Sequence, residues 1–462
     1  MPASSAIFFA FNYCVVNIVL KIKQINFDPH IIATLFLRFW SVIAGGITVI
    51  LIPVFFSPVE QGYYYTFNNI LMLQVFFELG MGQVIIQLAA HEAAQLRDGN
   101  GDSVRSKAFA RLASLRKLLA KSYMAVFLLF VISVVVAGFF FFWNSELPLE
   151  KWIYPWIFLV LATGINLNLS WRLAILEGQG YVKDVNRVRL VQSIFGFGLM
   201  WALMMVGGGL WSVFIVPAVA AIYTIFWLNK SRLHDDSAGA ASNKEQSDGG
   251  NINWRTEILP FQWRIAVSWI SGFFIFQLFT PVAFKYYGAA EAGRLGLCIT
   301  LFNSLVAVST SWVGAKVPVI GGLISQEKRV EASALYKRMA SFSFIFTIFS
   351  TSILVLSIYL VKWLGFPIAS RLPEMISVIF IALACLGNAF INSAALFMRA
   401  HKEEPLLYCS IAMAALVALA CNLTASWGVN WIMASYGMLV WLVSLPWTLI
   451  MLKRYYKPQP RA

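Results

Sequence analysis

The sequence predicts an all-α polytopic membrane protein with twelve transmembrane helices, arranged as two six-helix lobes related by a parallel repeat. The chain has 462 residues, of which 60% are hydrophobic and 12% charged, with a mean hydropathy of +0.73. Soluble domains are about half apolar and about a quarter charged. Only helices or closed barrels can span a bilayer. Barrel strands alternate apolar and polar residues, whereas the apolar runs here continue for roughly 20 residues, the length of a spanning helix.

The internal repeat is visible as two matching series of residues. Arg38 is followed by Gly46, Pro53, Phe55, Glu60 and Gly62, and Arg264 is followed by Gly272, Pro281, Phe284, Glu291 and Gly293. The two arginines are 226 positions apart, and the fourth and tenth apolar runs match at a separation of 221. With six spans in each half, the halves have the same polarity, which predicts two lobes related by an axis along the membrane normal.

The apolar runs place the spans in order along the chain. They predict helices at 35–56, 63–90, 118–142, 152–176, 187–206, 210–229, 260–284, 293–323, 341–361, 374–400, 406–426 and 430–452. The corresponding divisions are an N-terminal extension (1–34), an N-lobe (35–229), a flexible cytoplasmic linker (230–256), a C-lobe (257–453) and a cytoplasmic tail (454–462). The linker is rich in Ser, Gly, Asn and Asp, which favours flexibility.

The N-terminal extension contains an apolar stretch, 6–20, that is short for a span. Its positive charges follow the stretch rather than precede it, which is not the order in a signal peptide. We expect an interfacial helix or a loose extension there.

The basic residues divide unequally between the two sides of the membrane. With the predicted spans, 30 of the 35 Lys and Arg residues fall on the side of the two termini or at helix ends facing it. The other side holds only Lys151, Lys285, Arg294, Lys362 and Arg371. Because cytoplasmic loops carry the excess of Lys and Arg, both termini are expected in the cytoplasm. The second half of the basic 91–117 segment is expected to form an amphipathic helix on anionic lipid or a solvated topology signal.

Several functional classes find no support in the composition. The net charge of +14 is explained by the basic loops, so no nucleic-acid partner is expected. The five Cys and four His have no metal-ligand spacing, and no metal or other cofactor is expected. Walker A, HExxH and GxSxG motifs are absent from the sequence, so no catalytic residues are predicted.

Five charged residues within spans are the candidate site: Arg38, Glu78, Arg172, Arg264 and Lys316. Insertion of a charge at a helix centre costs about 2.5–3.5 kcal/mol, and such groups usually face the bundle interior or water. Arg38 and Arg264 are near cytoplasmic helix ends. They either snorkel to the headgroups or offer a planar fork to the paired oxygens of a phosphate.

The other three candidates also keep two interpretations each. Glu78 either pairs with a neighbouring helix or stays protonated, or it serves ion coupling or lines a cavity. Lys316 precedes Pro318, which can kink the eighth span, and it is either a functional cation or an anchor at the cytoplasmic end. Arg172 is expected to face a cavity or the interface.

Three short segments carry a family resemblance: Pro58-Val59-Glu60-Gln61-Gly62-Tyr63, Glu78-Leu79-Gly80-Met81-Gly82 and Ile175-Leu176-Glu177-Gly178-Gln179-Gly180. In order and layout they resemble the N-terminal half of polysaccharide-export (O-antigen and capsule type) flippases, in the superfamily that also holds multidrug and toxin extruders and the lipid II flippase. The resemblance covers roughly 35–455. Glu78 stands where this pattern usually has Asp.

The resemblance implies a flippase for a polyprenyl-diphosphate-linked oligosaccharide in the bacterial inner membrane. Its lobes would rock about a cationic central cavity, in which Arg38 and Arg264 would contact the diphosphate. Lys316 and Arg172 are further candidates for the diphosphate or the cavity lining, and Glu78 is a candidate for ion coupling or the lining. Membrane lipids, a polysaccharide polymerase and glycosyltransferases are the implied partners. The alternatives are a cation-coupled small-molecule exporter, which would need acidic cavity residues, and a membrane glycosyltransferase or polymerase, which would need a large external loop or an acidic metal-binding motif.

Overall fold

The computed structural model describes residues 29–98, 102–231, 259–401 and 404–456, and within these ranges it contains helices and no strand. The predicted extension, linker and tail lie mostly outside the described residues. The first described helix, α2 (Pro29–Phe55), begins six residues before the predicted span at 35.

The N-terminal bundle, which we call the N-lobe, contains the elements up to residue 230. After α2 they are α3 (Pro58–Leu71), α4 (Gln74–Glu78), α5 (Met81–Asp98), α6 (Asp102–Phe142), α7 (Leu149–Gly178), α8 (Val182–Met205), η1 (Gly209–Ser212) and α9 (Ile215–Lys230). The chain turns sharply into α3 because Ser57 and Glu60 form a capping box there and Pro58, at the first helical position, has no N–H to satisfy.

The C-terminal bundle, the C-lobe, contains the remaining elements. They are α10 (Leu259–Phe276), α11 (Phe279–Gly314), α12 (Val317–Ser325), α13 (Arg329–Trp363), η5 (Pro367–Arg371), α14 (Met375–Arg399), α15 (Leu407–Thr424), α16 (Val429–Leu439), η6 (Val440–Ser444) and α17 (Leu445–Tyr456). The first turns of α11 are separated from the rest by Gly288, whose φ of 84° lies in a region that favours glycine.

The described helices account for the predicted spans. Ten segments are long and apolar enough to cross a membrane, or eleven with the bent pair Pro58–Glu78 and Met81–Arg97. One of the ten, Ile265–Ser325, has 61 residues. At 1.5 Å per residue it is about 90 Å long, about three times a bilayer core. Since it contains most of α10, all of α11 with the turn at Gly288, and α12, it covers two of the predicted spans, 260–284 and 293–323.

The two lobes repeat the same packing. In the N-lobe α2 packs on α8, α5 on α7 and α6 on α7; in the C-lobe α10 packs on α15, α11 on α14 and α13 on α14. The ends of the matched helices keep one offset, because Phe142 and Trp363 end α6 and α13, and Gly178 and Arg399 end α7 and α14. Both pairs are 221 positions apart. The all-α repeat predicted from the arginine series is therefore present in the packing.

The basic 91–117 segment is part of two long helices, which does not fit a helix lying on the lipid surface and leaves the alternative of a solvated topology signal. Residues up to Asp98 extend α5, and those from Asp102 extend α6, which continues to Phe142 without a break. α6 is 41 residues long, about 60 Å at 1.5 Å per residue, so it projects beyond the bilayer rather than lying on its surface. Its buried Leu112 and Leu115 belong to the core that joins α5, α6 and α7, which favours continuing the helix.

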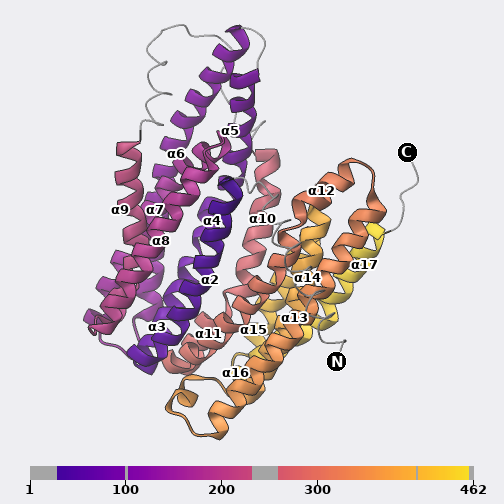
Figure 1. The fold of residues 1–462 in the computed structure, drawn as a ribbon. Coiled ribbons are helices and arrows are strands. Elements are labelled where there is room, and N and C mark those ends of the chain that lie inside the picture. Colours follow the sequence, from indigo (N-terminus) through magenta and orange to yellow (C-terminus); the bar gives the residue numbers. More distant parts are fainter. Residues whose placement is uncertain (1–28, 99–101, 232–258, 402–403, 457–462) are drawn as a thin grey trace, which may run out of the picture.

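Figure 1 shows the two bundles side by side, converging at one end and diverging at the other. At the converging end α2 turns into α3 and α11 turns at Gly288; we call it the closed end. At the other end α5 meets α6, α12 meets α13, and α14 and α17 finish; we call it the basic end. Most of the contacts between the lobes join α3 to α11.

Candidate functional site

The lobes meet most closely where α3 crosses α11 at two glycines. A Cβ on Gly62 would stand 1.8 Å from the carbonyl oxygen of Ala289, and a Cβ on Gly293 would stand 2.7 Å from the backbone nitrogen of Gly62. The buried side chain of Gln61 donates from Nε2 to the carbonyl oxygen of Gly293 at 2.8 Å. Small residues let helix backbones approach in this way in membranes. The crossing closes this end of the molecule.

An aromatic cluster extends the closure. Phe284, from the first segment of α11, packs edge-on against Tyr63 and Phe142 of the N-lobe, with ring centroids 5.1 and 5.2 Å apart. It also contacts Phe141 at 5.6 Å. Edge-to-face pairs of this geometry contribute about 0.5–1.5 kcal/mol each beyond burial. The C-lobe thus inserts one ring into an N-lobe cluster.

Polar contacts at the closed end join loops of the two lobes. Arg371, in η5, donates from Nη2 to the carbonyl oxygen of Phe56 at 2.7 Å. Glu146 accepts a hydrogen bond at 2.8 Å from the backbone nitrogen of Ala289. Burial lowers the pKa of the Arg371 guanidinium, and Arg294 nearby lowers it further. We call Arg371, Phe56, Glu146 and Ala289 the latch.

A central cavity of about 330 Å³ lies next to this closure, between α3 of the N-lobe and α10 and α11 of the C-lobe. Among the described residues its polar lining consists of amides and hydroxyls, with no charged side chain: Tyr65, Asn69, Gln277, Thr280, Thr300, Asn303 and Ser304. Tyr65 and Thr280 are 6% and 1% exposed, and the Tyr65 Oη and Thr280 Oγ1 atoms have no hydrogen-bond partner among the described residues. Buried polar atoms usually have partners. The other amides and hydroxyls of the lining can donate hydrogen bonds to, and accept them from, a neutral polar ligand.

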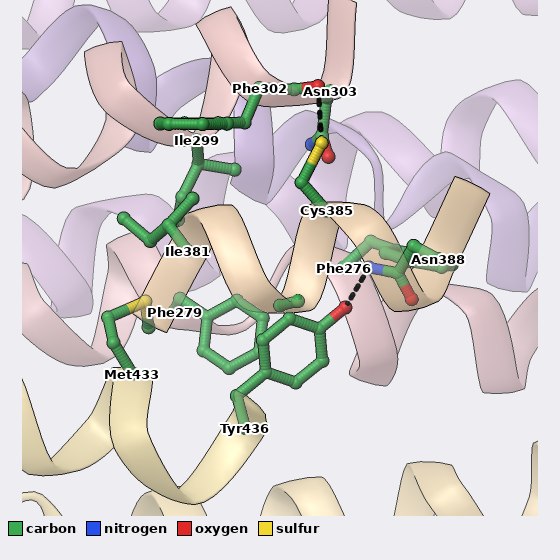
Figure 2. Close-up of a pocket in the computed structure, with 11 residues that line it drawn as sticks. Phe276, Phe279, Ile299, Phe302, Asn303, Ile381, Cys385, Asn388, Met433 and Tyr436 are labelled. Atoms are coloured by element: carbon green, nitrogen blue, oxygen red, sulfur yellow. Dashed lines mark hydrogen bonds between the residues drawn. The ribbon is translucent and has the colours of Figure 1, made fainter. Parts of the chain in front are cut away.

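A smaller pocket of about 20 Å³ adjoins the central cavity inside the C-lobe. The two share Phe276, Ile299 and Asn303. Figure 2 shows the aromatic rings that line it and the hydrogen bond from Asn388 Nδ2 to the Tyr436 hydroxyl, which is 2.8 Å long. Tyr436 comes from α16 and Asn388 from α14, so this pair joins two helices and supports the cavity wall.

Arg38, Lys316 and Arg172 are not among the described residues that line the central cavity. Arg38 is exposed on α2 and Lys316 is exposed at the break between α11 and α12. Arg264 lies on α10, and only its place on the helix is described. The next residue, Ile265, has its Cγ2 atom 2.3 Å from where a Cβ on Gly80 would stand. Position 264 is therefore close to the junction of the lobes, at the break between α4 and α5.

Glu78 ends α4 at this break, where Leu79 and Gly80 have positive φ angles of 51° and 70°. Glu78 is half-buried and an electrostatic neighbour of Tyr123 on α6. Its Oε1 atom would stand 3.2 Å from a Cβ on Gly82. The carboxyl group therefore belongs to the N-lobe side of the break and does not line the central cavity.

Arg172 points into the N-lobe rather than into the space between the lobes. Its guanidinium lies 5.3 Å from the centre of the Trp171 ring, and its buried Nε has no described hydrogen-bond partner. With Arg116 and Leu228 it lines a small cavity of about 20 Å³ among α6, α7 and α9.

The segment Ile175–Gly180 has a structural role. A Cβ on Gly178 would stand 2.5 Å from the carbonyl oxygen of Ile86, so α5 and α7 are in close contact. Glu177 pairs with Arg189 of α8 at 2.9 Å, and Arg97 donates to the carbonyl oxygen of Gln179. These contacts fix the basic end of the N-lobe.

Sequence reasoning missed the neutral cavity residues and the latch. Asn69, Gln277 and Asn303 are isolated amides inside apolar runs. Their position in these runs was the one sequence pattern that could have indicated a polar cavity lining. Arg371 was noted only as one of the few cations of its side. Among the described residues, no group of three or more His, Cys, Asp or Glu side chains could hold a metal ion.

No family model matches the sequence, and no curated protein matches it. Solved structures match over almost the whole chain. The lipid II flippase MurJ, in an inward closed conformation, is 12% identical with a TM-score of 0.61 and covers 92% of this chain and 87% of its own.

A multidrug resistance MATE family transporter of the MOP superfamily matches in two conformations. Its inward-facing form has a TM-score of 0.54 at 14% identity, covering 90% of this chain and 99% of its own. Its outward-facing form has a TM-score of 0.51 at 15% identity, covering 93% and 97%. At these identities the likeness shows the fold, an all-α multi-pass membrane fold shared by MurJ and MATE transporters.

Proposed function

We propose that the protein is a flippase that moves a polyprenyl-diphosphate-linked oligosaccharide from the cytoplasmic to the periplasmic leaflet of a bacterial inner membrane. The glycan would be an O-antigen, capsular or similar cell-surface repeat unit. The carrying observation is the neutral polar lining of the central cavity. Amides and hydroxyls both donate and accept hydrogen bonds, as the hydroxyls of a sugar do.

The lining also weighs against the alternative of a cation-coupled exporter of small molecules. An organic cation in a low-dielectric cavity requires a compensating carboxylate, and no carboxylate is among the residues that line the described central cavity. The nearest candidate from the sequence, Glu78, faces the N-lobe. The fold is shared with both a multidrug transporter and a lipid II flippase, and the cavity chemistry supports the flippase of the two.

The charged part of the substrate would bind nearer the basic end. Arg38 and Arg264 lie on helices that run toward the basic end, and Lys316 lies in that direction at the break between α11 and α12. An arginine fork matches the paired oxygens of a diphosphate. We propose that this end faces the cytoplasm, because cytoplasmic segments carry the excess of Lys and Arg. The described conformation, closed at the other end, would then be the one that loads substrate.

Transport would require the lobes to rock about the cavity. Opening the closed end breaks the glycine crossing, the Phe284 contacts and the latch, all of which join the lobes through a limited set of residues. Rocking of one lobe against the other around a fixed central site is the usual mechanism in repeat-built transporters. Glycosyltransferases would act before this step, and a polymerase would act after it.

The test uses the purified full-length chain in proteoliposomes. A fluorescent polyprenyl-diphosphate-linked oligosaccharide is placed in one leaflet, and its appearance in the other is followed by an impermeant quencher. Faster crossing than in protein-free vesicles is expected, together with no increase in the efflux of cationic dyes. Dye efflux without lipid crossing would favour the exporter. Sugar transfer to an acceptor by the same preparation would favour the glycosyltransferase.

A further inference from the structure

A cavity of about 700 Å³ lies on the C-lobe between α13, α14 and α17. None of its lining residues comes from the N-lobe or from α10 and α11, which separate it from α3 (Figure 1). It is therefore distinct from the central cavity. We call it the C-lobe groove.

The walls of the groove are apolar over most of its length. Phe344 of α13, Phe390 of α14 and Leu445 of α17 are among them. Ser343 also lines the groove, but its hydroxyl already donates to the carbonyl oxygen of Ser309 at 2.8 Å. The Ser343 hydroxyl on this wall therefore does not need a hydrogen bond from a bound ligand. Because these helices are membrane spans, hydrocarbon rather than water is the available filling.

The ends of the groove differ in chemistry. Trp441, in the π-helical turn η6, is held by a hydrogen bond of 2.9 Å from its Nε1 to the carbonyl oxygen of Leu383. Lys337, two turns into α13, and Lys453, in the last turn of α17, line the other part, toward the basic end. An apolar slot with two ammonium groups at the level of the helix ends complements a lipid with an anionic headgroup.

Comparison of the two repeats shows that the equivalent cavities of the two lobes differ in size. At the offset of 221, Arg116 corresponds to Lys337 and Arg172 corresponds to Ser393. All four line the cavity of their own lobe. In the N-lobe the cavity measures about 20 Å³ because Arg172 and Trp171 occupy it. In the C-lobe the small Ser393 leaves about 700 Å³.

We infer that the C-lobe groove binds one anionic phospholipid of the bilayer leaflet at the basic end. One acyl chain lies along Phe344, Phe390 and Leu445 and reaches Trp441, and the phosphate binds Lys337 and Lys453. This inference does not depend on what the central cavity transports. In the described part of the N-lobe the equivalent cavity is too small for a lipid, because Arg172 occupies the position of Ser393 with its larger side chain.

The first experiment compares two matched double variants. Native mass spectrometry measures binding of phosphatidylglycerol to the full-length protein in detergent. A surface lysine contributes on the order of 1 kcal/mol to attraction of anionic lipid, so Lys337→Gln with Lys453→Gln is expected to weaken binding of one lipid roughly thirtyfold. Arg338→Gln with Arg454→Gln removes the neighbouring exposed cations, which do not line the groove, and should leave binding unchanged. Equal losses in the two variants would overturn the inference.

The second experiment locates the chain. Phosphatidylglycerol brominated along one acyl chain should quench the fluorescence of Trp441, measured as the difference between the wild type and Trp441→Phe. Phosphatidylcholine with the same brominated chain should quench the Trp441 fluorescence much less. In the lysine double variant, most of the quenching of Trp441 by phosphatidylglycerol should be lost. Equal quenching by the two lipids, or quenching unaffected by the lysine substitutions, would show that the groove does not select an anionic lipid.

Discussion

Gly62 and Gly293 occupy equivalent positions in the two halves of the chain and touch each other across the lobes, since a Cβ on Gly293 would stand 2.7 Å from the backbone nitrogen of Gly62. A two-fold relation explains this contact. In an interface between two equivalent units, residues near the symmetry axis meet their own counterparts. The sequence repeat and the closest contact between the lobes are therefore one feature.

The glycine crossing predicts the effect of adding a single methyl group. Gly62→Ala places a carbon 1.8 Å from the Ala289 carbonyl oxygen, and neither backbone can yield. Overpacking of this kind costs about 1–3 kcal/mol, which corresponds to a shift of roughly 5- to 150-fold away from the closed arrangement. Electron–electron distance measurements between spin labels at Asn144 and Ser370, in a background without the native cysteines, should show a longer-distance population.

The matched control for this prediction is Gly45→Ala on α2. A Cβ there has nothing within 4 Å, so the same chemical change should leave the distance distribution as in the wild type. Gly293→Ala should act like Gly62→Ala, with a smaller effect because its nearest contact is longer. An unchanged distribution in Gly62→Ala would show that the crossing does not hold the closed end.

Loss of the Arg371 contact in the latch is expected to open the closed end less than Gly62→Ala does. Arg371→Met removes the donor to the Phe56 carbonyl oxygen and should increase the rate at which an impermeant maleimide, added from the closed end, labels a cysteine placed at Thr300 in the central cavity. A charged hydrogen bond of this kind contributes about 1.5–3 kcal/mol, so an increase of at least tenfold is expected.

Lys151→Met is the control for the latch, because Lys151 is an exposed cation of the same predicted side. It should not change the labelling rate. If Arg371→Met and Lys151→Met gave the same rate, the net charge of this end rather than the Arg371 contact would be responsible.

The fold could be predicted from the sequence because spans are local. An apolar run of the right length is a helix in a bilayer whatever surrounds it, and the predicted ends at 142 and 400 lie within a residue of Phe142 and Arg399. The extension of α6 to Asp102 could not be predicted in the same way. Its first turns are polar outside and held by Leu112 and Leu115 inside, a pattern that also fits a surface helix.

The site was less accessible to prediction because it depends on how the lobes dock. A charged residue inside a span indicates a functional site because its insertion into the membrane is strongly unfavourable. Neutral residues such as Asn303 and Thr280 are inserted more easily, so their presence in an apolar run is a weaker signal. Whether such a residue faces lipid, its own lobe or the other lobe is decided by packing. Arg172 illustrates the converse, since its charge was visible but its pocket within the N-lobe was not.

The neutral cavity predicts a substrate-dependent loss. Asn303→Leu removes an amide from the lining of both the cavity and the adjoining pocket. A lost hydrogen bond is worth about 1 kcal/mol, so crossing of the lipid-linked oligosaccharide should slow roughly fivefold. Asn422→Leu, which alters an exposed amide of α15, should have no effect. Equal rates for wild type and Asn303→Leu in the proteoliposome assay would remove the cavity from the proposed glycan path.

The two repeat-related arginines predict a difference between lysine and alanine replacements. If Arg38 and Arg264 grip a diphosphate, Arg→Lys fails nearly as badly as Arg→Ala, because an ammonium cannot make the two parallel hydrogen bonds of the fork. If they snorkel, lysine serves equally well. In a strain that depends on this protein for surface polysaccharide, we expect both substitutions at both positions to lower polysaccharide roughly tenfold or more at unchanged protein abundance in membranes. Arg338→Ala, at an exposed cation of α13, should leave polysaccharide normal. Normal polysaccharide in Arg38→Lys and Arg264→Lys would assign the arginines to the headgroups and leave the diphosphate to other residues.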